Sequence, residues 1–583
     1  MRVLLALLLA PLFALLFASE LDSLPVLHQG RVKPFSVAAD ETLLALAGTS
    51  RLPDSGTPSE ALFALLQDPA GWADKPLVYV PWLALRPELG LAPDMQRASL
   101  HQVEQLHAKL EAVSTRKQRS EQSGILETWS ADDEAANTLA NRYAEALQVA
   151  SGRTIQLVPL ATDAEERAWV LKTVAARLKE PTRPWHATLQ GVLAKPDGQD
   201  ARLAEADIWL TWEDLVRSPD PLLADAPPRL AALIATGKEL GAVANAGDPA
   251  LARLLPTLTG ELYARQGKAR PGLIAAELTY VRLKPFTIAW VCFILGGIAV
   301  GSGLQARRGL YHAGLALTAT AILATVGGLA VRTAITGLGA VTNLYETLIY
   351  VSLIVGVLGL VFSRQSGQAI YAVAGGIGAG LCAMIGEAMP PDLGSHIGQL
   401  QPVLRSKFWL WIHVKTVVAA YAPLTLALVL GNITLARAWW QRRAVTMAES
   451  KLLYRCLQWG TVLMAAGTLL GAVWADQAWG RFWGWDPKEV GALMIILTYL
   501  VPLHLRYVGA VGPTGLAGWA VLGYLAVIWS WYGVNFILGA GLHAYAFGTG
   551  GQLIILPLAG AQILVAATLL IGIKRRTAAP AAA

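Results

Sequence analysis

Long apolar runs dominate the chain from residue 284 onward. Each run is close to the roughly 20 residues that cross a bilayer as a helix. The predicted spans are 286–304, 309–331, 344–363, 369–388, 412–436, 456–474, 489–506, 515–537 and 552–573. The pattern therefore predicts an all-α fold, a polytopic membrane bundle over residues 284–576 with a short tail at 577–583.

Residues 20–283 follow a different pattern. Charges are frequent, and apolar residues recur at helical spacing in 99–113, 133–150 and 163–180. Prolines and glycines punctuate the remainder. We expect a separate, mostly helical domain outside the membrane.

Residues 1–19, MRVLLALLLAPLFALLFAS, combine a basic start with an apolar run. This pattern is typical of a signal peptide or a signal anchor. Leu16-Phe17-Ala18 is a poor cleavage site, which favours an anchor that is not removed.

Composition supports a membrane protein, since 54% of the 583 residues are hydrophobic and only 15% are charged. Cys292, Cys382 and Cys456 lie far apart in apolar runs, and no C-x-x-C occurs. This argues against thiol-disulfide chemistry and a cysteine zinc site, and the chain is not itself a c-type cytochrome. The net charge of +6 is concentrated at the ends of the spans, so it does not indicate nucleic acid as a partner.

Basic residues predict the orientation of the bundle. If the spans alternate, the basic residues that follow the odd-numbered spans all fall on one side, which the positive-inside rule makes cytoplasmic. They are Arg307, Arg308, Arg364, Arg437, Arg442, Arg443, Lys451, Arg455, Arg506, Lys574, Arg575 and Arg576. In a bacterium this places the chain in the inner membrane, with 20–283 in the periplasm.

The segment 474–489, WADQAWGRFWGWDPKE, lies on the predicted outer side between the sixth and seventh spans. Indoles at a membrane edge often form only an aromatic belt. Asp486 and Glu489 could likewise only cap the seventh span, because acids favour helix N-termini and Pro487 suits a helix start.

Four histidines lie at predicted membrane edges, where ionisable groups are functional candidates. His413 and His543 are on the outer side, and His312 and His504 on the inner side. Two imidazoles are too few for tetrahedral zinc but suffice for the axial positions of a haem iron.

Haem would also account for the aromatic residues, because a flat apolar macrocycle needs aromatic walls. Its propionates would pair with outer cations, of which the candidates are Arg405, Lys407, Arg481 and Lys488. An ordinary interfacial role is the alternative for each histidine, and it is favoured for His312.

WGRFWGWDPKE closely resembles the tryptophan-rich "WWD" signature of haem-handling membrane proteins. The surroundings are most similar to the CcsA (ResC) family of cytochrome c synthases, known as System II. The matching pieces, in the family's order, are VTNLYETL (341–348), LQPVLRSKFWLWIHV (400–414), the signature, LHLR (503–506) and GLHAY (541–545).

The resemblance implies roles for individual residues. His413 and His543 match the two outer histidines that hold the iron of haem b. His504 matches an intramembrane histidine of a second haem site, and topology alone makes His312 its candidate partner. The residues that match or adjoin the haem-holding signature are Trp474, Trp479, Gly480, Trp483, Trp485, Asp486 and Glu489.

The implied function is covalent attachment of haem, after it crosses the membrane, to the C-x-x-C-H motif of an apocytochrome c. A CcsB (ResB)-type membrane subunit is an implied partner. Residues 24–35, LPVLHQGRVKPF, resemble the start of an extra domain in longer family members, and we expect 20–283 to contact the partner or the substrate. Two alternatives stay open: a haem exporter or delivery protein without ligation activity, and a permease with a periplasmic domain.

Overall fold

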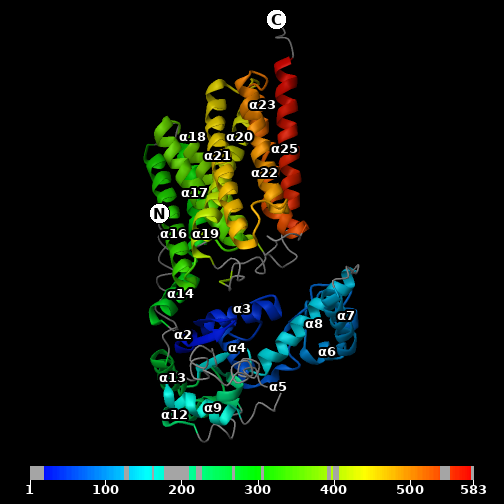
Figure 1. The fold of residues 1–583 in the computed structure, drawn as a ribbon, viewed down its shortest axis with the longest axis vertical. Coiled ribbons are helices and arrows are strands. Elements are labelled where there is room, and N and C mark those ends of the chain that lie inside the picture. The colour runs from blue at the N-terminus through cyan, green and yellow to red at the C-terminus, as the bar shows by residue number, and fades with distance from the viewer. Residues whose placement is uncertain are drawn as a thin grey trace. The chain divides into compact units, whose positions relative to one another are not determined.

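The chain forms two compact units, Met1–Leu283 and Lys284–Ala583 (Figure 1). The computed structural model describes residues 19–123, 130–160, 163–175, 209–217, 226–265, 270–303, 308–339, 341–389, 396–397, 406–538 and 552–578. The predicted signal segment, apart from Ser19, and the predicted ligand His543 lie outside the described residues.

The second unit is a bundle of apolar helices. In the described part of the chain, nine helical stretches are long and apolar enough to cross a membrane, and each overlaps one of the nine predicted spans. Its helices are α15 (Pro285–Gly303), α16 (Arg308–Thr336), α17 (Leu344–Ser366), α18 (Ile370–Ala388), α19 (Lys407–Trp409), α20 (Lys415–Trp440), α21 (Met447–Trp479), α22 (Pro487–Tyr507), α23 (Pro513–Leu522), α24 (Tyr524–Ile528) and α25 (Gln552–Ala578). Two π-helical segments, η7 (Leu410–Val414) and η8 (Trp529–Leu538), precede α20 and follow α24. The all-α, multi-pass membrane fold is confirmed.

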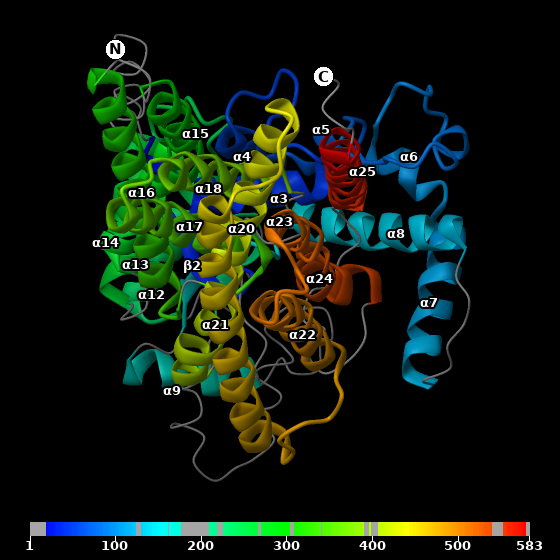
Figure 2. The ribbon, with the colours of Figure 1, turned by 90° about the horizontal axis from the view of Figure 1, so that it is seen from above.

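Glycines allow helices to pack closely in the first half of the bundle, where α15 packs on α16 and α18, and α17 on α18 (Figure 2). A Cβ on Gly359 of α17 would lie 2.7 Å from the Cα of Gly375 of α18. Small residues of this kind let membrane helices approach backbone to backbone. Helix α20 joins this half to the second half, because it contacts α17, α18, α21, α23 and α25.

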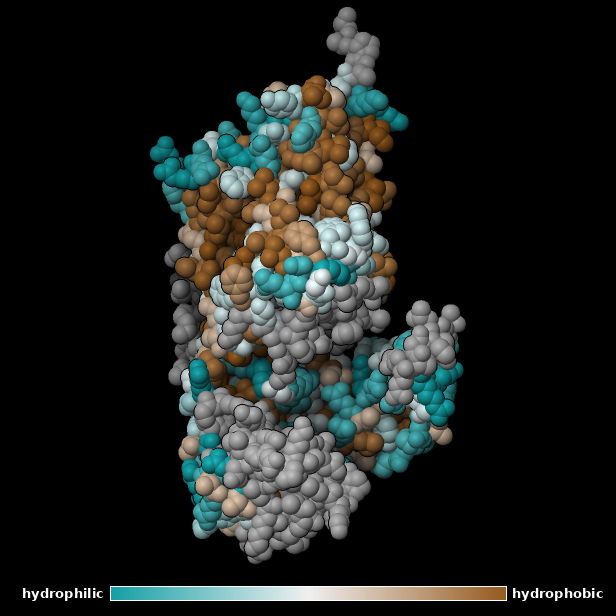
Figure 3. Space-filling view, in the orientation of Figure 1, coloured by the Kyte–Doolittle hydropathy of each residue, from teal (hydrophilic) through white to brown (hydrophobic). Residues whose placement is uncertain are grey.

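The sides of the bundle are apolar. Figure 3 shows a broad brown area over the helices, with teal residues at their ends. Leu323 and Leu564 are 72% and 70% exposed, which water would penalise and lipid tails would not. Such a surface is what a bilayer requires of a spanning bundle.

We name the two ends of the bundle by their residues. The tryptophan end holds the α16–α17 connection, η7, the α21–α22 connection and the end of η8. The basic end holds the connections rich in arginine between α20 and α21 and after α25.

The first unit combines helices with short antiparallel strands. Its helices are α2 (Glu20–Ser23), α3 (Phe35–Ala47), α4 (Pro58–Gln67), α5 (Pro69–Trp72), α6 (Leu100–Glu104), α7 (His107–Ser123), α8 (Ala131–Ala150), α9 (Ala164–Ala175), α12 (Pro228–Gly241), α13 (Leu251–Arg265) and α14 (Pro271–Leu283). The strands form one sheet in the order β2-β1-β5-β6 and a second pair β3-β4. They are β1 (Pro25–His28), β2 (Arg31–Pro34), β3 (Val78–Tyr79), β4 (Arg97–Ala98), β5 (Gln156–Pro159) and β6 (Trp209–Thr211).

Within the segment 24–35, residues 25–34 form the β1–β2 hairpin, with β2 as an edge strand of the four-stranded sheet. Its two-residue turn, Gln29-Gly30, has φ values of 48° and 76°, which is typical of a type I′ turn. Arg31 binds both carboxylate oxygens of Glu277 in α14 at 2.8 and 2.6 Å, and buried Lys33 pairs with Glu41 of α3. The hairpin is therefore tied by ion pairs to the helix that directly follows it, α3, and to α14 at the end of this unit.

The buried position of His28 predicts that the stability of the first unit depends on pH. Its imidazole is buried, and burial followed by the charge of Lys33 lowers its pKa from 6.5 to about 4. Between pH 6.5 and 4, His28 binds a proton in the unfolded chain but stays neutral in the folded unit. The free energy of unfolding therefore falls as the pH is lowered through this range. At 1.36 kcal/mol per pKa unit, the loss reaches about 3 kcal/mol.

A His28→Gln variant should show a much smaller loss of stability over this pH window. Pulse proteolysis of the full chain in denaturant at pH 7.5 and 5 measures the difference for residues 20–283. An equal loss in the variant and the wild type would contradict this role for His28.

Candidate functional site

The imidazole of His413 packs over Gly471 of α21, and we call this position on the helix the groove. Its Nδ1 is 2.9 Å from the carbonyl oxygen of Gly467. A carbonyl oxygen can only accept a hydrogen bond, so Nδ1 carries the proton and the lone pair is on Nε2. A backbone carbonyl commonly orients a metal-binding imidazole in this way.

The groove exists because α21 lacks a side chain where the imidazole packs. A Cβ on Gly471 would overlap Cε1 of His413 and lie 2.9 Å from Nδ1. Trp474 packs edge-on against the same ring, with centroids 5.7 Å apart. Gly467, Gly471 and Trp474 are spaced by four and three residues, so they share one face of α21.

The backbone that carries His413 is irregular. The residue lies in η7, a single π-helical segment between α19 and α20. π-Bulges of this kind occur frequently at functional sites. Trp409, just before η7, donates its Nε1 hydrogen to Gln477 of α21 at 2.8 Å, which adds a second link between the two elements.

The tryptophan segment is a short loop between two helices. Helix α21 ends at Trp479, Gly480 follows in the left-handed conformation with φ 68°, and α22 begins at Pro487. Trp485 has φ 58°, which is unusual for a bulky residue. Its ring stands perpendicular to that of Trp483 at 5.8 Å, and it is 70% exposed.

Asp486 and Glu489 form a capping box at the start of α22. The side chain of Asp486 accepts from the backbone N–H of Lys488 at 3.0 Å, and Glu489 accepts from that of Asp486 at 3.1 Å. Glu489 also accepts from Gly484 N–H at 2.8 Å. The capping interpretation of these acids is confirmed, and the caps fix the loop that presents the two indoles.

Two of the four predicted propionate-binding cations, Arg481 and Lys488, have protein partners in the structure. Arg481 pairs with Glu489 at 3.2 Å and lies over the ring of Trp479. Lys488 donates to the carbonyl oxygens of Ser530 and Trp531 at 2.7 and 3.2 Å, so its ammonium is directed into the protein. Arg405 lies outside the described residues.

The two inner histidines are not brought together. His504 lies near the end of α22, with Nδ1 2.9 Å from the carbonyl oxygen of Leu500, one turn earlier. His312 lies near the start of α16 and packs on Tyr311. Both side chains are exposed, and α16 and α22 lie on different sides of the bundle in both ribbon views (Figures 1 and 2).

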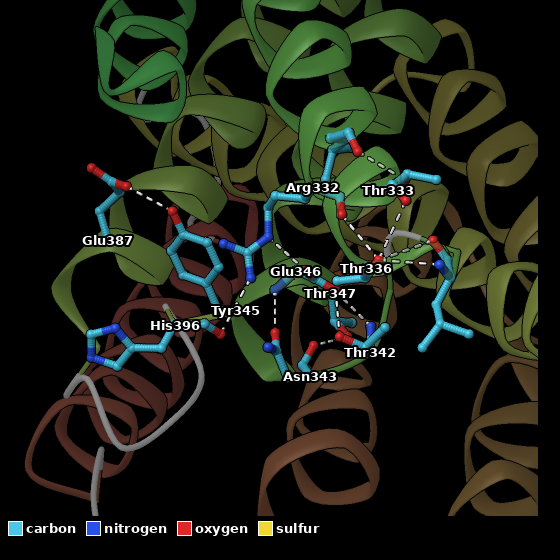
Figure 4. Close-up of polar contacts among 12 residues, drawn as sticks. Arg332, Thr333, Thr336, Thr342, Asn343, Tyr345, Glu346, Thr347, Glu387 and His396 are labelled. Atoms are coloured by element: carbon cyan, nitrogen blue, oxygen red, sulfur yellow. Dashed lines mark hydrogen bonds and ion pairs between the residues drawn. The ribbon is translucent and has the colours of Figure 1, made fainter. Parts of the chain in front are cut away.

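A buried ion pair between α16 and α17 organises the VTNLYETL segment (Figure 4). Arg332 donates from Nε to Glu346 at 2.6 Å, and their side chains are 1% and 2% exposed. The other oxygen of Glu346 accepts from the backbone N–H and the hydroxyl of Thr342, at 2.8 and 2.6 Å. Asn343 caps α17 by accepting from Glu346 N–H at 2.9 Å.

This network extends from the ion pair towards neighbouring segments of the tryptophan end. Arg332 lies 5.3 Å from the ring centre of Tyr345, whose hydroxyl donates to Glu387 of α18 at 2.9 Å. A Cβ on Gly339, in the same connection, would lie 3.3 Å from the indole nitrogen of Trp411 in η7. The connection held by the ion pair thus lies against the segment that carries His413.

Sequence reasoning did not find the role of Arg332. The residue lies at the end of an apolar span, 14 positions before its partner. An arginine at membrane depth was the available signal, because such a charge needs a partner.

Comparisons with known proteins match the membrane unit. The model of a family described as "Cytochrome C assembly protein" matches residues 341–543. Cytochrome c biogenesis protein CcsA of Synechococcus sp. (strain CC9902) is 31% identical over 263 residues, which cover 40% of this chain and 86% of that protein. CcsA of Thermosynechococcus vestitus is 30% identical over 285 residues, which cover 41% of this chain and 88% of that protein.

The chain belongs to the CcsA family of cytochrome c biogenesis proteins. Protein NrfI of Wolinella succinogenes is 33% identical over 229 residues, and the match spans 38% of this chain but only 25% of NrfI. As a CcsA-family member, the protein acts in cytochrome c biogenesis, and this family handles haem. The matched residues 341–543 contain His413, the tryptophan segment and Glu346.

Proposed function

We propose that this CcsA-family protein binds haem b at the tryptophan end and attaches it to apocytochrome c. His413 and His543 would hold the iron from its two faces. The observation that carries the proposal is the hydrogen bond from His413 Nδ1 to Gly467, which puts the lone pair on Nε2. The exposed indole of Trp485 supplies an apolar surface of the kind a porphyrin needs.

Haem is the substrate of the proposed reaction. Each thiol of the C-x-x-C-H motif adds across one vinyl group, so sulfur bonds one vinyl carbon and the thiol hydrogen goes to the other. The histidine of the motif replaces one of the two protein imidazoles on the iron. Holding the vinyls and thiols together is the main contribution of the protein, because orientation removes much of the entropic barrier.

The proposed orientation places the tryptophan end outside the cytoplasm. The arginines of the basic end would lie in the cytoplasm of a bacterium, and the first unit in the periplasm. His504 would hold haem at a second site during its passage through the membrane. A CcsB (ResB)-type subunit would be the membrane partner.

The decisive experiment for ligation is expression with a c-type apocytochrome in a host that lacks other maturation genes. A synthase, alone or with a CcsB-type subunit, yields holocytochrome whose haem stays attached in denaturing gels. A delivery protein of the same superfamily yields bound haem but no covalent product. A permease yields neither.

Residues 20–283 are proposed to contact the apocytochrome or the membrane partner. Deleting them from the full chain, with the leader kept, should lower holocytochrome yield while the spectrum of bound haem is retained. Unchanged yield would end this part of the proposal.

Replacing Gly471 by alanine should weaken haem binding by about 10- to 100-fold, as loss of an orienting contact to a metal ligand commonly does. The added methyl group would overlap the imidazole of His413 and turn it out of the groove. Gly327→Ala is the matched control, because Gly327 lies in α16 with nothing within 4 Å of its Cβ position. Haem titration followed by absorbance measures both variants, and equal affinities would contradict the packing argument.

A further inference from the structure

Lys488 connects three elements at the tryptophan end. It is the second residue of α22, directly after the tryptophan loop, and its Nζ donates to Ser530 and Trp531 carbonyls of η8 at 2.7 and 3.2 Å. Charge-assisted hydrogen bonds of this kind are roughly twice as strong as neutral ones. A partly buried ammonium must find such partners, because burial removes part of its contact with water.

The contact between α22 and η8 is close on the next turn as well. A Cβ on Gly491 would lie 2.7 Å from the hydroxyl oxygen and 2.9 Å from the Cβ of Ser530. The carbonyl oxygen of Trp531 also accepts from the side-chain amide of Asn535 at 3.2 Å. The first turn of η8 is therefore tied to the start of α22.

The same residues reach the helix that follows His413. The indole of Trp531 stacks on the ring of Tyr421 in α20, with centroids 5.6 Å apart and planes 28° apart. Tyr421 is eight residues, about two turns, beyond His413. Lys488 thus joins the tryptophan loop to η8 directly and to α20 through Trp531.

We propose that Lys488 is a positioning residue that sets the geometry between the tryptophan loop and two elements, η8 and α20, that adjoin the proposed iron ligands in the sequence. The inference rests on the proposed function, since it deepens the account of the same haem site. Lys488 touches neither iron nor porphyrin in this account. It acts through the carbonyl groups that it holds.

The test compares Lys488→Met, which keeps the length of the side chain but removes the donors, with Lys488→Arg, which keeps them. Lys451→Met, an exposed lysine at the basic end, is the matched control. In haem-loaded protein, we expect Lys488→Met to bind carbon monoxide at least tenfold faster than wild type, because a loosened ligand leaves the ferrous iron sooner. Lys488→Arg should restore the slow rate, and the control should equal wild type.

A second measurement does not need haem. Spin labels on cysteines introduced at Phe482 and Leu538, both about half exposed, report the distance between the tryptophan loop and the end of η8. The native cysteines are buried and should label poorly. Lys488→Met should broaden this distance distribution, and Lys451→Met should not.

The two readouts separate the inference from the proposed function. A wild-type protein without haem overturns the proposed function, whereas the label distances still test Lys488. Identical distance distributions in wild type and Lys488→Met overturn the inference, even if haem is bound. A broader distance distribution without any change in the rate of carbon monoxide binding would give Lys488 only a structural role. That result also overturns the inference.

Discussion

Replacing His413 by alanine is expected to lower holocytochrome formation by at least 100-fold. The substitution removes one proposed axial ligand, and no other imidazole in the described residues packs in the groove formed by Gly467 and Gly471. A six-coordinate low-spin spectrum should give way to a five-coordinate one, and His413→Ala/His543→Ala should lose the Soret band. Bis-histidine ligation requires both effects.

His101→Ala is the matched control for this prediction, because His101 is an exposed histidine that pairs with Asp74 in the first unit. It should leave both the yield and the spectrum unchanged. A His413→Ala protein with wild-type spectrum and yield would rule out His413 as a ligand. Variants that do not reach the membrane are recognised by their abundance in membrane fractions.

Breaking the buried pair of Arg332 and Glu346 is expected to give the largest loss of stability. Arg332→Met leaves the carboxylate of Glu346 buried without its countercharge, which typically costs about 3–5 kcal/mol. The α16–α17 connection should loosen with it, because Glu346 also binds Thr342. Thermal unfolding in detergent, followed by near-ultraviolet circular dichroism, measures the effect.

Two variants make this prediction specific. Arg443→Met breaks a more accessible pair with Glu449 at the basic end, and its expected cost is about 1 kcal/mol or less. The double variant Arg332→Met/Glu346→Met should be more stable than Arg332→Met alone, since no charge is left buried. Equal stabilities for Arg332→Met and Arg443→Met would show that breaking the buried pair costs no more stability than breaking the more accessible one.

The membrane fold could be predicted from sequence because hydrophobic length alone decides it. A run such as 344–363 has few charges and enough residues to span a bilayer, and the structure places α17 there. The short strands of the first unit escaped prediction for the opposite reason. β1 and β2 have four residues each, too few for an alternating pattern to stand out, and burial of Lys33 with Glu41 breaks that pattern further.

The sequence predicts which residues belong to the candidate site but not which contacts they make. The sequence indicates that His413 and the tryptophans belong together, because they border the same predicted side of the membrane. It does not indicate that Gly471 makes room for the imidazole, since a glycine in an apolar helix has many uses. Lys488 is one of four candidate cations for the propionates, and the sequence does not indicate that its ammonium donates to the carbonyl oxygens of Ser530 and Trp531.

The absorption and electron paramagnetic resonance spectra of the full-length protein, purified from haem-replete cells, test the central claim most directly. The proposed site predicts a Soret band and a low-spin signal of bis-imidazole iron, both altered when His413 is replaced. Colourless protein, or haem whose spectrum is the same with and without His413, would contradict it.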